Sequence, residues 1–314
     1  MSNLTARILV ALVAIPLILL VSMSGGFYFF GLMALISALS LYEYYRLARA
    51  KAARPQVLTG LVFGLCVNAV FVYDKLQYVI LEAATGWGLA IPLPSMAQWF
   101  LILALVFVPT IVLIELFRNN GSALINVAVT LFGVFYVSFF LGSFVGLREL
   151  FVPADFPIFL YFNVHGIEIA ADIVEKVYAW GGYTVIAVLA SIWVCDSAAF
   201  FAGRAWGRHK LFPRVSPNKT WEGAVAGFTG AVLAFVAARE FALPYMTMTS
   251  AIVCGSIVGV FGQLGDMVES LLKRDAGVKD SSGLIPGHGG VMDRFDSLIL
   301  VSPVIFLYLD FIVF

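Results

Sequence analysis

The sequence predicts an all-α integral membrane protein that crosses the bilayer many times. Of its 314 residues, 61% are hydrophobic and 12% are charged, whereas ~25% charge is usual in soluble domains. Mean hydropathy is high, at +0.98. Several stretches reach the ~20 apolar residues with which a helix spans a bilayer. The net charge is zero, so charge indicates no partner, and we expect no nucleic-acid binding.

Nine apolar stretches are predicted to be transmembrane helices, with the N-terminus in the cytoplasm and the C-terminus outside. They cover residues 7–23, 26–47, 57–73, 97–117, 123–146, 181–202, 222–240, 247–270 and 296–314. In this orientation fifteen of the 19 Lys and Arg residues lie on the cytoplasmic side, as the positive-inside tendency requires. A cleaved signal peptide is the alternative for the first stretch. The second long stretch follows so closely that we favour a retained helix.

The connections divide the chain into three predicted parts, 1–96, 97–180 and 181–314. Residues 74–96 are apolar but broken by Gly and Pro, and we expect them to lie on the outer surface or to re-enter shallowly. Residues 149–180 form a long external insert whose apolar residues recur at helical spacing, which predicts a helix lying on the outer membrane surface. The charged connections 203–221 and 271–295 both open on the cytoplasmic face.

Acidic residues inside the predicted spans are expected to be functional, because a charge in the membrane is unfavourable. The four that we single out are Asp196, Glu222, Asp266 and Glu269. On a helical wheel, Asp266 and Glu269 share one face with a stripe of glycines (Gly255, Gly259 and Gly262). A close helix contact through small residues is the simpler explanation of the glycines. We expect Asp266 and Asp293 to converge on one cation, with a structural salt bridge as the alternative for Asp266.

The loop 203–223 reads GRAWGRHKLFPRVSPNKTWEG. Ser216 and Pro217 are predicted to begin a helix, with Ser as its cap and Pro in its first turn. The free N–H groups of such a start, near Asn218, Lys219 and Thr220, would form an anion site. The alternative is an ordinary basic loop on the positive side of the membrane.

The stretch Ser270–Asp296 combines four cations and four carboxylates with several glycines. His288 lies between two of these glycines, which permit positive φ or close approach to a ligand. We interpret His288 as a phosphate or substrate contact, against the alternative of a solvated loop histidine. Carboxylates without a His or Cys cluster suit Mg²⁺, and neighbouring Lys and Arg suit phosphoryl or nucleotidyl transfer. The residues therefore indicate Mg²⁺-dependent phosphate chemistry on a lipid at the cytoplasmic face.

The spacing within this stretch resembles the signature of the phosphatidate cytidylyltransferases (CDP-diacylglycerol synthases). The matching residues run from Ser270, Lys273 and Arg274 through His288-Gly289-Gly290 to Asp293-Arg294-Phe295-Asp296. The resemblance is dense over 195–314 and weak over 1–180. It implies transfer of a cytidylyl group from CTP to phosphatidate, giving CDP-diacylglycerol and pyrophosphate. It also implies a bacterial-type cytoplasmic (inner) membrane location, and we expect a homodimer.

The resemblance further implies roles for individual residues. Asp266 and Asp293 would bind Mg²⁺, in a site that could hold two cations, and Ser270, Lys273 and Arg294 would hold phosphates during catalysis. Substrate-binding residues are expected to be Arg204, Ser216, Asn218, Lys219, Thr220, Arg274, Lys279, His288 and Asp296. Supporting roles are assigned to Asp196, Glu222 and Glu269.

Two other functions remain open at this stage. A CTP-dependent polyprenol or phytol kinase would use the same nucleotide but release CDP in place of pyrophosphate. An ion-coupled secondary transporter would also explain intramembrane acids and a glycine-rich helix. It would not need a charge-dense cytoplasmic loop between the last two spans.

Overall fold

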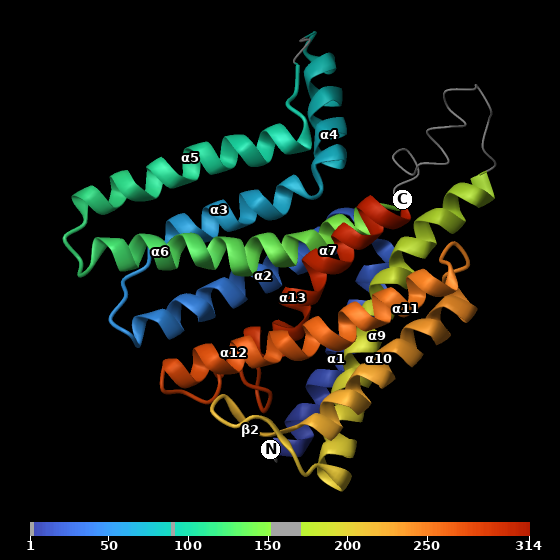
Figure 1. Ribbon diagram of the computed structural model, residues 1–314. Coiled ribbons are helices and arrows are strands. Elements are labelled where there is room, and N and C mark those ends of the chain that lie inside the picture. Colours follow the sequence, from blue (N-terminus) through green and yellow to red (C-terminus); the bar gives the residue numbers. More distant parts are fainter. Residues whose placement is uncertain (1–2, 89–91, 152–170) are drawn as a thin grey trace. The chain divides into compact units, whose positions relative to one another are not determined.

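The computed structural model describes residues 3–88, 92–151 and 171–314, and within these ranges the chain is almost entirely helical (Figure 1). The sheet in these ranges is a two-stranded antiparallel hairpin of β1 (Lys210–Phe212) and β2 (Ser216–Thr220). The predicted all-α membrane fold is therefore confirmed.

Among the described residues, seven helices are long and apolar enough to cross a membrane. The pair α3 (Val57–Val70) and α4 (Tyr73–Gly86), which is bent by 87°, adds an eighth if it is counted as one span. α1 (Asn3–Ser24) contains a shorter apolar helix, Ile8–Ser24. The nine predicted stretches all fall mainly on helices, while the number that cross the membrane and the orientation of the termini stay predictions.

The helices are grouped into two compact units. The first combines residues 1–25 with 147–314 and contains α1, α9 (Ala171–Trp206), α10 (Trp221–Ala242), α11 (Met248–Ile257), η2 (Val258–Gly262), α12 (Gln263–Asp275), α13 (Met292–Tyr308) and η3 (Leu309–Val313). The second comprises residues 26–146 and contains α2 (Gly26–Arg49), α3, α4, α5 (Met96–Phe117), α6 (Ala123–Gly133) and η1 (Val134–Phe139). α7 (Phe140–Glu149) contains the boundary between them.

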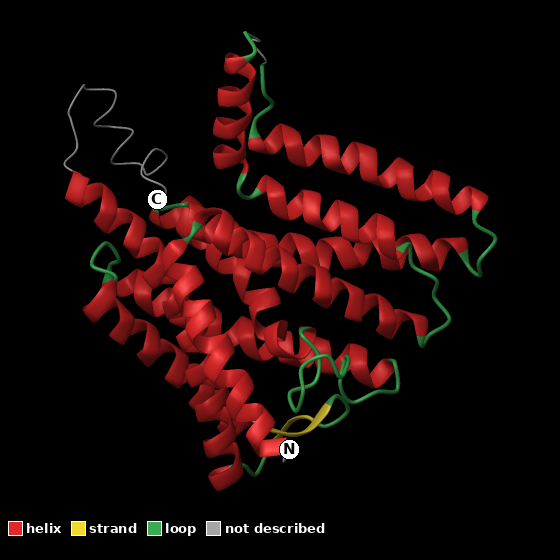
Figure 2. Ribbon diagram, turned by 180° about the vertical axis from the view of Figure 1, so that it is seen from behind, coloured by secondary structure: helices red, strands yellow, loops and turns green. Residues whose placement is uncertain are grey.

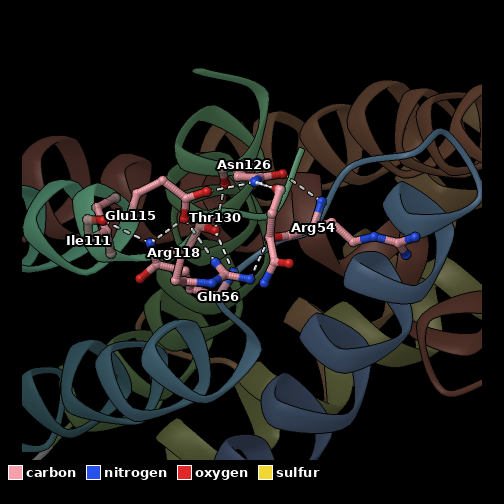
Figure 3. Close-up of polar contacts among 8 residues, drawn as sticks. Arg54, Gln56, Ile111, Glu115, Arg118, Asn126 and Thr130 are labelled. Atoms are coloured by element: carbon pink, nitrogen blue, oxygen red, sulfur yellow. Dashed lines mark hydrogen bonds and ion pairs between the residues drawn. The ribbon is translucent and has the colours of Figure 1, made fainter. Parts of the chain in front are cut away.

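In the second unit, a buried carboxylate on α5 joins several elements (Figure 3). Glu115 accepts hydrogen bonds from Gln56 Nε2 at 2.8 Å, from Arg118 Nη1 at 2.9 Å and from Asn126 Nδ2 at 2.6 Å. Glu115 is 5% exposed. A buried carboxylate is stable only when it is paired in this way, so this network fixes the ends of α5 and α6 against the segment that precedes α3.

In the first unit, a fully buried arginine holds the end of α1. Arg148 Nε donates to Ser22 O at 2.9 Å and Nη2 donates to Met23 O at 3.2 Å. Its guanidinium lies 4.2 Å from the ring centroid of Tyr178, whose hydroxyl donates to Ser24 O. Cationic donors at a helix C-terminus satisfy its last carbonyls. α1 is thereby tied to α9, against which it packs.

The prediction of a separate helix lying on the outer membrane surface is wrong for the part of the insert that the structure describes. Residues 171–180 form the first turns of α9, which continues unbroken to Trp206. Residues 152–170 lie outside the described ranges. Val177 is buried beside Phe151, with Trp180 and Tyr245 packed around them. Among the described residues of the apolar face, Val174 and Val177 therefore pack against protein, whereas Ala171 is exposed.

The glycine stripe makes close helix contacts, as its simpler explanation predicts. A Cβ on Gly255 would lie 2.6 Å from Val232 Cα, and one on Gly259 would lie 3.0 Å from Phe228 Cα, both on α10. The third glycine of the stripe, Gly262, makes no such approach, since a Cβ there would lie 3.8 Å from the nearest atoms, on Ser297 and Val301. Gly265, outside the stripe, does: a Cβ there would lie 2.4 Å from the carbonyl oxygen of Asp296. Gly255 and Gly259 therefore allow close contact with α10, and Gly265 allows close contact of α12 with α13.

Candidate active site

A cavity of about 750 Å³ lies in the first unit, among α9, α10, α12, α13 and the hairpin. Figure 2 shows the hairpin and the loop 276–291 at one end of the helices, and both contribute residues to the cavity wall. Its wall carries five carboxylates and four cations: Asp196, Asp266, Asp280, Asp293, Asp296, Arg204, Lys219, Lys273 and Arg294. Positively and negatively charged side chains line the same cavity, which suits a polyanionic ligand accompanied by a cation.

The hairpin brings a lysine to the helix that carries Asp266. Lys219 Nζ, on β2, lies 2.7 Å from Asp266 Oδ2 on α12. Ser270, one turn along α12, donates its hydroxyl to Asp266 Oδ1 at 3.2 Å. Asp266 therefore has one partner on each oxygen, and both Lys219 and Asp266 face the cavity.

A second lysine joins α12 to α13. Lys273 Nζ lies 2.6 Å from Asp293 Oδ1 and also contacts Glu269 Oε2 on its own helix. Asp293 Oδ2 accepts hydrogen bonds from Ser281 N at 3.0 Å, from Ser281 Oγ at 3.0 Å and from Gly290 N at 2.7 Å. The Asp293 carboxylate thus binds Lys273 and also holds the loop 276–291 at two residues, Ser281 and Gly290.

The glycines of this loop have the conformations that the sequence suggested. Gly287 and Gly289 have φ of 75° and 85°, a region that side chains disfavour. The turn is closed by hydrogen bonds from Ile285 N to Gly289 O and from His288 N to Ile285 O, both 2.9 Å. A Cβ on Gly289 would lie 2.7 Å from Asp293 Oδ2. The glycines therefore let the loop fold closely over Asp293.

The helix start predicted at Ser216 is wrong. Ser216–Thr220 forms strand β2, which pairs with β1, and α10 begins at Trp221. Thr220 is the N-cap, and its Oγ1 accepts the N–H of Gly223 at 3.2 Å. The backbone near Asn218 and Lys219 is therefore extended, so these residues reach the cavity as side chains and not as a helix N-terminus.

The structure brings most of the predicted site residues to one cavity. Those that line it are Asp196, Arg204, Asn218, Lys219, Thr220, Asp266, Lys273, Asp293, Arg294 and Asp296. The remaining predicted residues are not part of its wall: Ser216, Glu222, Glu269, Ser270, Arg274, Lys279 and His288.

Several of these outlying residues have contacts of their own. Glu222 accepts from the His209 backbone N–H and lies 2.7 Å from the His209 ring, at the base of the hairpin. Arg274 Nη1 donates to Val278 O at 3.1 Å. Ser270 and Glu269 contact Asp266 and Lys273, so they stand directly behind the wall.

Two polar residues of the wall have no assigned role in the sequence analysis, Gln263 and Asp280. Gln263 Nε2 donates to Ala224 O at 3.1 Å and to Gly259 O at 2.7 Å, which joins α12 to α10. An amide three residues before Asp266 lies on the same helical face, and this spacing was a usable signal. Asp280 lies within the charged stretch and among the residues that match the signature, but no role was predicted for it.

The oxygen donors of the wall fit a hard divalent cation. A carboxylate oxygen has two lone pairs, so each oxygen of Asp266 keeps one direction open beside the contacts given above. Among the described residues, no three His, Cys, Asp or Glu side chains are grouped as ligands of one ion. Mg²⁺ often takes one or two protein carboxylates and completes its shell with water and phosphate, and the carboxylates of the wall could supply these ligands.

Comparison with known proteins gives the family. Residues 5–312 match the cytidylyltransferase family. The phosphatidate cytidylyltransferase of Synechocystis sp. is 32% identical over 305 residues, which are 97% of this chain and 96% of that protein. That of Haemophilus influenzae is 44% identical over 137 residues (42% of this chain, 47% of that protein), and that of Bacillus subtilis is 48% identical over 123 residues (37% and 43%). Because the family match and one relative span nearly the whole chain, this protein is an enzyme of the cytidylyltransferase family.

Proposed function

We propose that this enzyme is a phosphatidate cytidylyltransferase, which converts CTP and phosphatidate into CDP-diacylglycerol and pyrophosphate. The observation that carries the proposal is the cavity, in which Lys219, Lys273 and Arg294 from three elements surround Asp266 and Asp293. A triphosphate and a lipid phosphate both need such cations. The relatives that bear this name support the same substrates.

In the proposed reaction, an oxygen of the phosphatidate phosphate attacks the α-phosphorus of CTP. A new P–O bond forms as the bond to the β-phosphate breaks, and the electron pair leaves with pyrophosphate. The nucleophile is already an anion, so no protein base is required. Catalysis then rests on positioning and on neutralising charge, which Lys219, Lys273, Arg204 and Arg294 would supply around the phosphates.

Asp266 and Asp293 would hold Mg²⁺ at this cavity, with Asp196 and Asp296 on the same wall available to a second cation. When bound, Mg²⁺ neutralises phosphate charge and orients the leaving group. The chain's own contribution is to fix the carboxylates: Ser270 and Lys219 orient Asp266, and the loop amides orient Asp293.

The proposed location is the cytoplasmic face of a bacterial-type inner membrane. The cavity lies where helices of membrane-spanning length meet the connections 203–221 and 271–295. These connections carry nine of the 19 Lys and Arg residues, and such loops tend to face the cytoplasm. A soluble nucleotide would enter from that side, and the lipid would remain in the bilayer.

The test is incubation of the purified protein with phosphatidate, labelled CTP and Mg²⁺. We expect a lipid-soluble cytidine product and one pyrophosphate for each product molecule. Release of CDP with a polyprenol or phytol phosphate would instead identify a lipid kinase. Ion-driven uptake by proteoliposomes, without any consumption of CTP, would identify a transporter.

Lys219→Ala should lower kcat/KM for CTP by about 100-fold, the usual effect of removing one donor to transition-state charge. The reason is that Lys219 reaches the cavity from β2 and lies 2.7 Å from Asp266. Initial rates over a range of CTP concentrations measure this effect. Lys210→Ala, on the exposed strand opposite, is the matched control. An equal loss in both variants would mean that the hairpin supplies only general positive charge.

A further inference from the structure

Glu269 is a fully buried carboxylate directly behind the cavity wall. It is 0% exposed and does not line the cavity, whereas its neighbours Lys273 and Asp293 do. Burying a carboxylate is unfavourable unless a cation compensates it. In the described part of the chain, that cation is Lys273, whose Nζ contacts Glu269 Oε2.

We propose that Glu269 is a positioning residue, which fixes the Lys273 ammonium against Asp293 and, through Asp293, the loop 276–291. The catalytic part of this inference rests on the proposed function. Its structural part does not.

The first step is the position of the ammonium between two carboxylates. Lys273 Nζ lies 2.6 Å from Asp293 Oδ1 and contacts Glu269 Oε2 on the other side. A lysine side chain has four rotatable methylenes and holds no fixed direction by itself. Two carboxyl groups that share one ammonium restrict it to one place. The Lys273 side chain is 11% exposed, so water offers it little alternative.

The second step is that Glu269 contacts the lysine and the aspartate that together join α12 to α13. Glu269 and Lys273 are four residues apart on α12, so their contact joins no two elements. The attraction between α12 and α13 in this region comes from the ammonium and Asp293. Glu269 also shares a hydrogen bond with the Asp293 carboxyl group. Glu269 therefore contacts both members of the pair that joins α12 to α13.

The third step leads from Asp293 to the loop. Asp293 Oδ2 accepts hydrogen bonds from the backbone N–H groups of Ser281 and Gly290, which lie near the two ends of the loop. Movement of Asp293 would therefore release both ends together. Asp280, next to Ser281, lines the cavity, so release of the loop would also change the wall.

The kinetic test uses Glu269→Gln, which keeps the shape and removes the carboxyl group, and Glu269→Asp, which keeps the carboxyl group but withdraws it by one methylene. We expect kcat to fall about 100-fold in the first and about tenfold in the second, since small misplacements of catalytic groups have effects of this size. KM for CTP should change by less than about threefold, as for an interaction made in the transition state.

The matched control is Glu115→Gln, which alters a buried, paired carboxylate in the other compact unit. It should lower the melting temperature while leaving kcat per folded molecule unchanged. If Glu269→Gln loses activity only in proportion to its loss of folded protein, Glu269 is structural and the inference is wrong.

Hydrogen–deuterium exchange gives a readout that does not depend on activity. In the full-length protein in detergent, a peptide covering 278–291 should exchange slowly, because Asp293 holds the Ser281 and Gly290 amides. Glu269→Gln should raise exchange in this peptide, and Glu115→Gln should not. Unchanged exchange in Glu269→Gln overturns the inference. Failure of the proposed function would appear separately, as a wild-type protein that makes no cytidine lipid.

A double variant tests the route through the lysine. If Glu269 acts through Lys273, adding Glu269→Gln to Lys273→Met should cause no further loss of activity, because coupled residues are not additive. The double variant should also melt at a higher temperature than Lys273→Met, which leaves a buried charge unpaired. A further tenfold loss of activity in the double variant would show that Glu269 acts independently.

Discussion

Asp266→Asn is expected to lower cytidylyl transfer about 1,000-fold, or about 4 kcal/mol of transition-state stabilisation, while the protein stays folded. Asp266 lies on the cavity wall, with Lys219 on one oxygen and Ser270 on the other. Asparagine keeps the shape and one acceptor oxygen. It removes the negative charge, on which both the proposed Mg²⁺ and the position of Lys219 depend.

The size of this effect follows from how little else could replace Asp266. Asp266 and Asp293 are the two carboxylates proposed to hold the cation, so each would supply a large share of the protein's contribution to it. Loss of one therefore leaves a site that binds Mg²⁺ weakly, and added Mg²⁺ should restore part of the activity.

Rates at increasing Mg²⁺ concentration measure this, with circular dichroism and a melting curve to check the fold. Asp172→Asn is the matched control, since Asp172 is an exposed aspartate paired with Lys176 near the other end of α9. Full activity of Asp266→Asn at ordinary Mg²⁺ concentration would contradict the metal assignment.

The membrane fold could be predicted because hydropathy is a local property of the sequence. Every predicted span fell mainly on a helix, since ~20 apolar residues have few other stable forms in a bilayer. The insert before α9 shows the limit of this method. Apolar residues at helical spacing, such as Val174 and Val177, identify a helix and its apolar face. They do not say whether lipid or protein covers that face, and here Val177 is buried against Phe151.

The charged residues of the site could be predicted from the sequence, but the backbone conformation around them could not. Asp266, Lys273 and Asp293 were identified because charges are rare and unfavourable near apolar spans. The strand Ser216–Thr220 was missed because Pro, Asn and Lys have low strand propensity. Its extended form depends on pairing with Lys210–Phe212 and on Thr220 as the cap of α10. Such pairing is a tertiary property, so the local sequence favoured the wrong element.

Asp293→Asn and Asp293→Ala are both expected to lower activity about 1,000-fold, but for different structural reasons. Asp293 uses Oδ1 for Lys273 and Oδ2 for Ser281 and Gly290. Asparagine has one acceptor oxygen and one N–H₂ group. Its oxygen can still hold the loop amides, whereas its N–H₂ would then face the Lys273 ammonium and repel it.

The two variants should therefore differ in the loop while agreeing in activity. In Asp293→Asn the loop stays closed and only Lys273 is displaced towards Glu269. In Asp293→Ala the amides of Ser281 and Gly290 lose their acceptor, and each such bond to a charged group contributes about 1.5–3 kcal/mol. The loop should then open readily.

Trypsin cleavage after Lys279, an exposed residue within this loop, measures the opening. We expect cleavage to be faster in Asp293→Ala and close to the wild-type rate in Asp293→Asn and in Asp266→Asn. Equal cleavage in the two Asp293 variants would mean that the loop is held by other contacts. Because the alanine variant loses both links and the asparagine variant only one, the comparison separates the role of Asp293 in placing Lys273 from its role in closing the loop.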